Sequence, residues 1–430
     1  MENLLELSAR IIDERDLHTA PNRVTEQLSE IADGVAVIES FSHCVVFDTG
    51  DGLVTFDASA ANKGAKVIES LRTWTDKPLD ALVYTHGHVD HVGGSGAFAA
   101  DAKASQHPLR VIGHEKVAER FSRYRKTNEF NQGINARQFG GARGAKDLLF
   151  HGANDFLPAD VIEPNETFSD RSQFRSGDTV FDLRHARGET DDHTWAWVPT
   201  HKAVCVGDFI TWVFPNAGNP QKVQRYAWEW GQALRQMAAL EPELLLPAHG
   251  LPVGGKDRIR TMLDTIAGVL EDLELRVVAL MNEGASIDDI VHSVTVSEDL
   301  LSLPYLKPVY DEPEFVVRNI WRLYGGWWGG DPALLKPAAP SQLATELVAL
   351  GGGADRFVER ALALTAEGEL RLACHLIEQA SLAAPDNLEV HEARAKIFGA
   401  RRTAERSLMA KGVFAGAMRE SQAKIEALGS

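Results

Sequence analysis

The feature that most constrains this chain is a run of metal-ligand side chains placed directly after an apolar segment. Residues 82–84, Leu-Val-Tyr, have the β-rich composition of a buried strand, and residues 85–94 then read Thr-His-Gly-His-Val-Asp-His-Val-Gly-Gly. The glycines in this run give the backbone freedom to turn sharply. The sequence therefore predicts a strand that ends in a loop carrying four ligand-type side chains: His86, His88, Asp90 and His91.

Imidazoles and carboxylates suit a divalent, borderline-soft cation such as zinc, which usually takes about four ligands. Four donors in so short a loop do not easily reach one ion, because Asp90 and His91 are neighbours that point in different directions. Two adjacent metal ions solve this problem, with His86 and His88 on the first and Asp90 and His91 on the second. The alternative is a surface loop that is rich in histidine by chance, which the pattern H-x-H-x-D-H after a strand disfavours.

Length and composition exclude several classes of protein. The chain has 430 residues, which suggests two or three compact units. Its net charge of −17 disfavours nucleic acid and anionic membrane surfaces as partners. No apolar run has membrane-spanning length, the acidic first segment does not fit a signal peptide, and three well-separated cysteines do not suggest a disulfide scaffold. We therefore expect a cytoplasmic protein with neither a nucleic-acid nor a membrane partner.

The order of the expected elements predicts an α/β protein with a helical end. Residues 1–30 read as an N-terminal helical extension. From residue 31 short β-type runs alternate with turns and amphipathic helices, which predicts an α/β domain over residues 31–256. Residues 257–430 have helical spacing, with tetratricopeptide-like helix pairs near the end. The stretch 128–144 has little periodicity, and we expect a long loop there.

The run 85–94 resembles the signature of the metallo-β-lactamase-fold hydrolases. This resemblance implies that residues 31–256 are a catalytic domain, a metallo-β-lactamase-like αβ/βα sandwich with a dinuclear metal site at one edge. It also implies three further ligands at the ends of later strands: Glu189, Asp208 and His249. Glu189 stands where the family often has the histidine of a G-H-T motif, Asp208 matches a carboxylate that bridges both metals, and His249 matches the last ligand of the second metal. The alternatives are a surface carboxylate for Glu189 and a helix N-cap for Asp208.

A second stretch is similar to the alkylsulfatase branch of that fold. Residues 321–332 are rich in aromatic residues and glycine, which alone would suit a core segment, but they resemble the branch's dimerisation string R-x-Y-x-G-W-x-x-G-x-P. The same branch has glutamate in place of the usual histidine, as at Glu189. The resemblance implies a homodimer that hydrolyses a small-molecule sulfate ester with a hydroxide between two divalent metal ions. Zinc is the first candidate, manganese or iron are alternatives, and Asp90 is both ligand and catalytic orienter.

One expected substrate motif is different in this chain. Alkylsulfatases generally present a histidine and an arginine after the bridging carboxylate, whereas residues 209–219 read Phe-Ile-Thr-Trp-Val-Phe-Pro-Asn-Ala-Gly-Asn. Asn135 and Arg137 are candidate contacts for the anionic group, with a surface ion pair as the alternative role for Arg137, and Arg225 is another candidate. The competing functions are hydrolysis of a phosphoester, lactone or carbamate, and a non-catalytic interaction protein.

Overall fold

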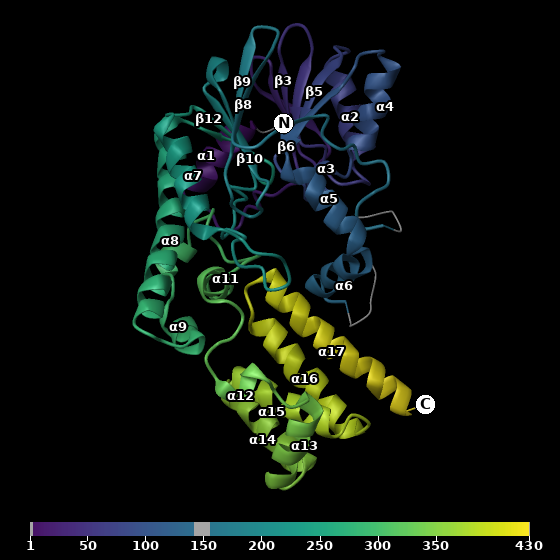
Figure 1. The fold of residues 1–430 in the computed structure, drawn as a ribbon, viewed down its shortest axis with the longest axis vertical. Helices are drawn as coiled ribbons and strands as arrows, with labels where there is room; N and C mark the ends of the chain where they lie inside the picture. Colours follow the sequence, from purple (N-terminus) through teal and green to yellow (C-terminus); the bar gives the residue numbers. More distant parts are fainter. Residues whose placement is uncertain (1–2, 142–154, 430) are drawn as a thin grey trace. The chain divides into compact units, whose positions relative to one another are not determined.

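The structure, a computed structural model, describes residues 3–141 and 155–429. The chain divides into two compact units. Unit 1 comprises Met1–Asn128 and Phe150–Gly326, and unit 2 comprises Glu129–Leu149 and Trp327–Ser430. Figure 1 shows the helices and strands of both units and labels many of them.

Unit 1 is built on two β-sheets. The first sheet has seven strands in sequential order and the second has six, in the order β13-β12-β11-β10-β9-β8. The strands of the first sheet are β1 (Leu28–Ala32), β2 (Val35–Ile38), β3 (Cys44–Asp48), β4 (Leu53–Phe56), β5 (Leu79–Val83), β6 (Arg110–His114) and β7 (Glu166–Phe168). The strands of the second sheet are β8 (Arg171–Ser176), β9 (Thr179–His185), β10 (Thr194–Val198), β11 (Ala203–Gly207), β12 (Leu244–Pro247) and β13 (Val253–Gly254).

Each sheet combines antiparallel and parallel pairs. Strands β1 to β4 form an antiparallel meander, and β4 to β7 pair in parallel. In the second sheet β8 to β11 are antiparallel, and β11 pairs in parallel with β12. Parallel neighbours present their carboxyl ends at the same sheet edge. The loops after β5 and β6, and those after β11 and β12, therefore leave their sheets in matching directions.

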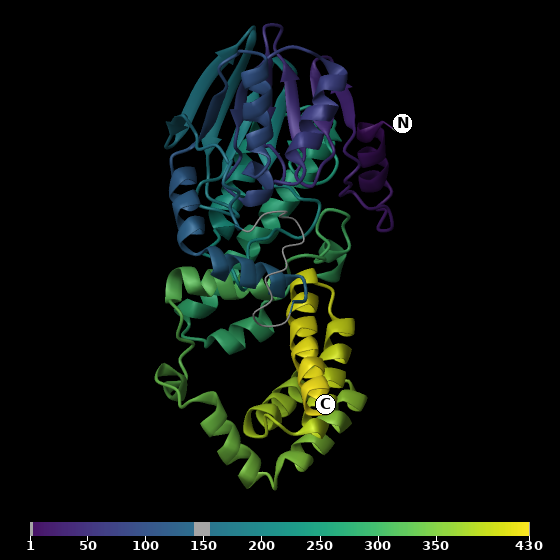
Figure 2. The same cartoon turned by 90° about the vertical axis from the view of Figure 1, so that its right-hand side faces the viewer.

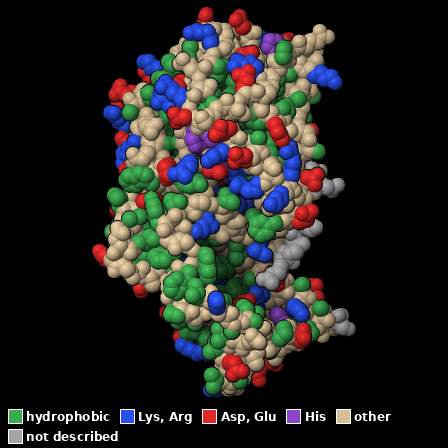
Figure 3. Space-filling view, viewed as in Figure 1, with side chains coloured by type: hydrophobic (Ala, Val, Ile, Leu, Met, Phe, Trp, Pro, Cys, Tyr) green, Lys and Arg blue, Asp and Glu red, His purple; other side chains and the backbone are tan. Residues whose placement is uncertain are grey.

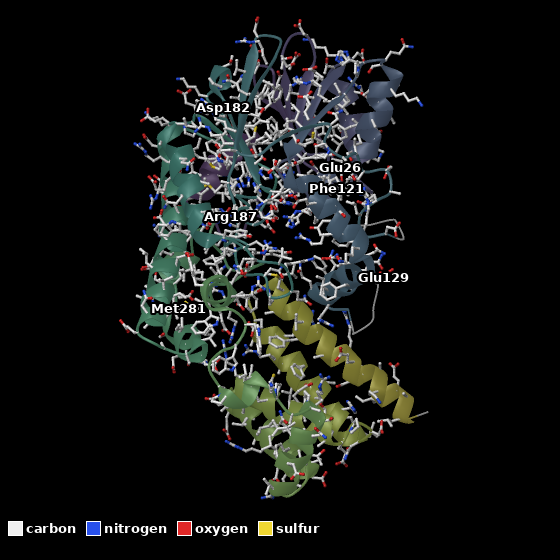
Figure 4. All side chains as sticks on the ribbon, in the orientation of Figure 1. Glu26, Phe121, Glu129, Asp182, Arg187 and Met281 are labelled. Carbon is white, nitrogen blue, oxygen red and sulfur yellow. The ribbon has the colours of Figure 1, made fainter. Side chains whose placement is uncertain are left out.

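Three apolar cores hold these layers together. The core between the sheets contains side chains from both, such as Phe47 and Phe181. The outer face of the first sheet packs against helices that include Phe121, labelled in Figure 4, and two of these helices, α2 and α4, lie side by side (Figures 1 and 2). The helices on the two outer faces are α2 (Gly64–Trp74), α4 (Ser95–Ala104) and α5 (Lys116–Lys126) on the first sheet, and α1 (Leu4–Asp13), α7 (Ala227–Ala239) and α8 (Lys256–Asn282) on the second. The predicted αβ/βα sandwich is confirmed.

Helices form the remaining described elements. Those of unit 1 are α3 (Val89–Val92), the 3-10 turn η1 (Pro199–His201), α9 (Ile287–Ser293), α10 (Glu298–Leu301) and α11 (Pro313–Gly325). Those of unit 2 are α12 (Pro332–Leu335), α13 (Pro340–Leu350), α14 (Ala354–Glu367), α15 (Leu370–Ala383), α16 (Leu388–Ala404) and α17 (Leu408–Gly429). The predicted helical end is present, and its first helices, α8 to α11, contribute to a core of unit 1. The domain boundary after residue 256 stays a prediction.

The N-terminal extension is helical over a shorter range than expected. The side chain of Asn3 caps α1 by accepting hydrogen bonds from the Leu5 and Glu6 backbones. The helix ends at Asp13, and Arg15 then takes a positive φ of 52° that does not continue a helix. Residues 28–32 join the first sheet as β1.

The prediction of a long loop over residues 128–144 is wrong for most of that range. Residues Asn128–Gln138 form helix α6, while positions 142–144 lie outside the described residues. Packing within unit 2 explains this helix. The backbone of Gly412 in α17 lies so close to the Gln138 carbonyl that an added Cβ would lie 1.9 Å from it, and Arg419 donates a hydrogen bond to the Gly140 carbonyl. These contacts join distant segments, so local periodicity did not reveal them.

The surface carries charges of both signs. On the face drawn in Figure 3, Lys and Arg side chains are interspersed with Asp and Glu side chains. None of the described helices combines the length and the hydropathy that a membrane-spanning segment needs.

Candidate metal centre

The seven predicted ligand residues come together at one edge of unit 1, where strands of both sheets end. Four lie just after β5 in the first sheet, and the other three lie in loops of the second sheet. In chain order they are His86 and His88 after β5, Asp90 and His91 in α3, Glu189 between β9 and β10, Asp208 after β11, and His249 after β12.

The first ligand group consists of His86, His88, Glu189 and Asp208, whose ligand atoms all lie within 4.8 Å of one another. His88 Nδ1 lies 2.8 Å from His86 Nε2 and 3.7 Å from Glu189 Oε1. His86 Nε2 lies 3.9 Å from Asp208 Oδ2. Donors around a tetrahedral zinc ion, with bonds of about 2.0–2.2 Å, lie about 3.3 Å apart. The separations therefore suit one metal ion.

The second ligand group consists of Asp90, His91 and His249. Asp90 Oδ2 lies 3.6 Å from His91 Nε2 and 3.4 Å from His249 Nε2. Asp208 is close to this group as well, with Oδ2 at 3.4 Å from His91 Nε2 and Oδ1 at 3.7 Å from His249 Nε2. This position between both groups is the one that a bridging carboxylate needs.

The chemistry of the centre fits a pair of cations. Two buried atoms, His91 Nε2 and Asp208 Oδ1, have no hydrogen-bond partner among the described residues, and buried polar atoms normally have one. Three carboxylates share this small volume with four imidazoles, and buried like charges require compensation. Two divalent cations would satisfy both the unpaired atoms and the carboxylate charge. The residues therefore fit the two divalent metal ions that the resemblance implies.

The negative potential at the centre is visible at His91. Burial alone would lower the pKa of this imidazole, but Asp208, Asp57 and Asp90 outweigh burial and raise the pKa well above its ordinary value. A potential that favours a proton on His91 favours a metal cation at the same place. The carboxylates of the centre therefore favour the binding of a cation through their charge, in addition to the positions of the donor atoms.

Asp57, which sequence reasoning did not assign to the site, orients two of the histidines from behind. It follows β4 and accepts a hydrogen bond from His91 Nδ1 at 2.7 Å. It also accepts the hydroxyl of Thr85 at 2.8 Å, and that hydroxyl lies 3.1 Å from His86 Nδ1. With their Nδ1 atoms held in this way, His86 and His91 present Nε2 to the centre. A carboxylate directly after a predicted strand was the available signal in the sequence.

Glu189 is held by a buried arginine and an amide. Arg225 Nη1 lies 2.6 Å from Glu189 Oε1, and Asn216 Nδ2 donates to the same oxygen. Arg225 also donates to the Asn216 carbonyl at 2.6 Å. The surface role considered for Glu189 is wrong, because the residue is only 4% exposed. Arg225 is committed to Glu189 and is therefore a poor candidate for binding an anionic substrate group.

Lys222 is a further basic residue that sequence reasoning missed. It lies in the segment between β11 and α7, and its ammonium nitrogen is 5.7 Å from the centre of the Phe156 ring. Burial, followed by the charge of Arg225, lowers the pKa of Lys222 to about 8, while Asp90 and Glu189 act in the opposite direction. The ammonium group is thus within electrostatic reach of both ligand groups.

Asn135 and Arg137, the predicted substrate contacts, lie in α6. They belong to unit 2, whereas the ligand residues belong to unit 1. Their contact with a substrate stays a prediction.

Two family profiles match the chain. The metallo-beta-lactamase superfamily matches residues 37–249, which include all seven candidate ligands, and the alkyl sulfatase dimerisation family matches residues 286–424. The chain therefore carries a metallo-beta-lactamase domain followed by an alkyl sulfatase dimerisation domain.

Individual relatives agree with this assignment. A linear primary-alkylsulfatase of Pseudomonas sp. is 25% identical over 384 residues, which are 84% of this chain and 69% of the relative. The alkyl/aryl-sulfatase BDS1 of Saccharomyces cerevisiae is 24% identical over 376 residues, or 84% of this chain and 56% of the relative. The solved structure of the stereoselective inverting sec-alkylsulfatase Pisa1 from Pseudomonas sp. has the same fold, with a TM-score of 0.80 at 21% identity over 92% of this chain and 65% of that one. The chain thus spans between 56% and 69% of the length of these relatives.

Proposed function

We propose that the chain is a hydrolase of sulfuric esters that depends on two divalent metal ions. The observation that carries the proposal is the convergence of seven ligand-type side chains at one edge of a domain whose relatives are alkylsulfatases. Zinc is the first candidate because the donors are imidazoles and carboxylates, and manganese or iron are alternatives. When bound, such a pair of ions supplies a water of lowered pKa and stabilises charge on the leaving oxygen.

Asp90 is assigned the role of orienting the attacking water. Its side chain is 26% exposed, more than that of Asp208 or Glu189, so it faces the accessible side of the centre. Burial opposes the ionisation of Asp90, but His91 and then His249 hold the pKa of Asp90 below its ordinary range. An ionised carboxylate accepts a hydrogen bond from water, and this fixes the direction of the water lone pair.

Lys222 is assigned to the anionic group of the substrate. Its ammonium offers three donors, whereas Arg225 is already paired with Glu189. A sulfate ester carries one negative charge, and a partly desolvated ammonium binds such a group more strongly than an exposed one does. This residue would supply the cation that the segment 209–219 lacks.

A substrate panel tests the proposal. The purified protein, loaded with zinc, is expected to release inorganic sulfate from primary or secondary alkyl sulfates, and metal-depleted protein is expected to release none until zinc is restored. The panel includes matched alkyl phosphates, lactones and carbamates. Turnover of one of these without sulfate release would replace the proposal with another hydrolase of the same fold. No turnover of any ester would favour the non-catalytic alternative.

We also propose that the protein is a homodimer formed through the aromatic segment 321–332. This segment lies in the region matched by the dimerisation family, and within it Trp327 is 74% exposed and Trp328 is 37% exposed. Light scattering is expected to give twice the chain mass, and Trp327→Ser with Trp328→Ser is expected to shift the mass toward that of a single chain. A strictly monomeric parent protein would contradict this proposal. The cytoplasmic location stays a prediction.

A further inference from the structure

A buried ion pair lies directly behind the loop that carries the first two histidines. Arg120 of α5 is 2% exposed, and Asp192, in the turn before β10, is fully buried. Arg120 Nε donates to Asp192 Oδ2 at 2.8 Å, and another guanidinium nitrogen pairs with Asp191. The pair therefore links a helix on the outer face of the first sheet to a turn of the second sheet.

Gly87 lies in direct contact with this Arg120–Asp192 pair. Its backbone N–H donates to the same oxygen of Asp192 at 3.1 Å. An added Cβ at Gly87 would lie 2.9 Å from both Arg120 Cδ and Asp192 Oδ2, so the loop is packed directly against the pair. Because Gly87 separates His86 from His88, the bond from Asp192 fixes the backbone between two ligands of the first group.

Stability alone gives a weak reason for such a pair. Removing two charges from water is costly, and apolar residues of similar volume often stabilise a fold equally well. A fixed carboxylate, in contrast, gives a backbone N–H a specific direction that an apolar side chain does not give. Residues behind metal ligands commonly act in this way, and their loss typically weakens metal binding about 10- to 100-fold.

We propose that Arg120 and Asp192 are positioning residues that hold the His86–Gly87–His88 backbone in the geometry needed to bind the first metal ion. The proposal rests on the metal centre proposed above. Both residues act through Gly87 rather than on the ion. Disrupting them therefore weakens the first metal site selectively, whereas the second ligand group keeps its affinity.

This selectivity is measured as the effect of an Arg120 substitution on zinc affinity in two variants, each of which keeps only one ligand group intact. His249→Ala leaves the first group intact, and His88→Ala leaves the second group intact. Arg120→Lys keeps the positive charge but removes the Nε donor that reaches Asp192. Competition with a chromophoric chelator is expected to show zinc binding about 10- to 100-fold weaker when Arg120→Lys is added to His249→Ala. The same change in His88→Ala is expected to leave zinc affinity within about twofold. Arg120→Lys alone is expected to keep about one of two zinc ions per chain after dialysis against the chelator.

Two further variants separate positioning from folding. The double change Arg120→Met with Asp192→Leu removes both charges, so no buried charge is left unpaired, and it is expected to fold but to lose the first metal. Arg171→Lys is the matched control, because Arg171 makes a bidentate pair with Asp182 on β8 and β9 at 2.6 and 2.9 Å. It is expected to change neither site.

Equal losses in both parent variants, or no loss in either, would overturn the positioning role while leaving the metal centre in place. A protein that binds none of zinc, manganese and iron even before Arg120 is changed would end both the proposed function and this inference.

Discussion

The two ligand groups of the metal centre differ in how their side chains are held. In the first group His86, Glu189 and Asp208 are buried, and the His88 side chain is 19% exposed. Buried charged residues stand behind this group: Arg225 pairs with Glu189, and the Arg120–Asp192 pair lies behind Gly87. In the second group Asp57 orients His91, but the side chains of Asp90 and His249 are 26% and 19% exposed.

This difference suggests a division of roles between the groups. A donor held by buried, charge-assisted hydrogen bonds loses little freedom when it binds a metal, whereas partly exposed donors have to be ordered by the ion. We therefore expect the first group to act mainly as a fixed anchor for its metal ion, and the second group to face the side from which a substrate arrives.

The largest expected effect on catalysis comes from removing one ligand from each group. These two variants also test whether the first group is the more rigid one. His88→Ala and His249→Ala are each expected to lower kcat/KM by more than about a hundredfold, beyond the loss typical of residues behind the ligands. In the presence of a chelator, His249→Ala is expected to keep its remaining zinc longer than His88→Ala does, because the first group, which is intact in His249→Ala, is more rigid. Elemental analysis and steady-state kinetics measure both quantities. Activity within tenfold of the parent would remove these residues from the ligand set.

Loss of the Glu189 charge tests the buried anchoring of the first group. Glu189→Gln leaves Arg225 buried without a carboxylate, and breaking one half of a buried pair costs about 3–5 kcal/mol. We expect a loss of this size in the free energy of unfolding, measured with urea in the presence of a metal chelator. Glu243→Gln is the control and is expected to change metal-free stability little, since it breaks an exposed ion pair with Lys202. Equal effects of the two changes would contradict the comparison.

The carboxylate behind the second group is expected to have a smaller effect. Asp57→Asn keeps the size of the side chain but removes the charge that accepts the His91 Nδ1 proton. In the His88→Ala variant, zinc binding by the second group is expected to weaken about 10- to 100-fold. Asp101→Asn, which breaks an ion pair with Arg72 between helices α2 and α4, is the control and is expected to leave zinc affinity unchanged. A loss in both variants would point to general destabilisation.

Substitution of Lys222 has the smallest predicted effect. It tests whether this residue binds the substrate on the accessible side of the centre. Lys222→Met is expected to raise KM for an alkyl sulfate about tenfold, the value of one charge-assisted hydrogen bond. Since the pKa of Lys222 is lowered to about 8, the ammonium loses its proton as pH rises through 8, and substrate affinity falls in the same range. Lys222→Arg is expected to keep affinity at pH 9. A pH profile of KM that is identical in all three proteins would remove Lys222 from the substrate site.

Local patterns in the sequence predicted much of the fold and the ligand set. Strands such as β2, β3 and β11 are short apolar runs between turn residues, and His86 to His91 stand within six positions, so neighbouring residues carried the information. Prediction failed where distant packing decides the structure. Helix α6 has weak periodicity of its own and is supported by α17, far along the chain.

The same distinction separates what the sequence alone determined from what the tertiary structure decided. The sequence determined the kinds of donor and their order at strand ends, because metal-ligand chemistry and strand patterns are local properties. The tertiary structure decided that Asp208 lies between the two groups, that Asp57 and Asp192 stand behind them, and that Arg225 is bound to Glu189. These relations join residues that are far apart in sequence, and only the packing of the two sheets brings their charges within a few ångströms of one another.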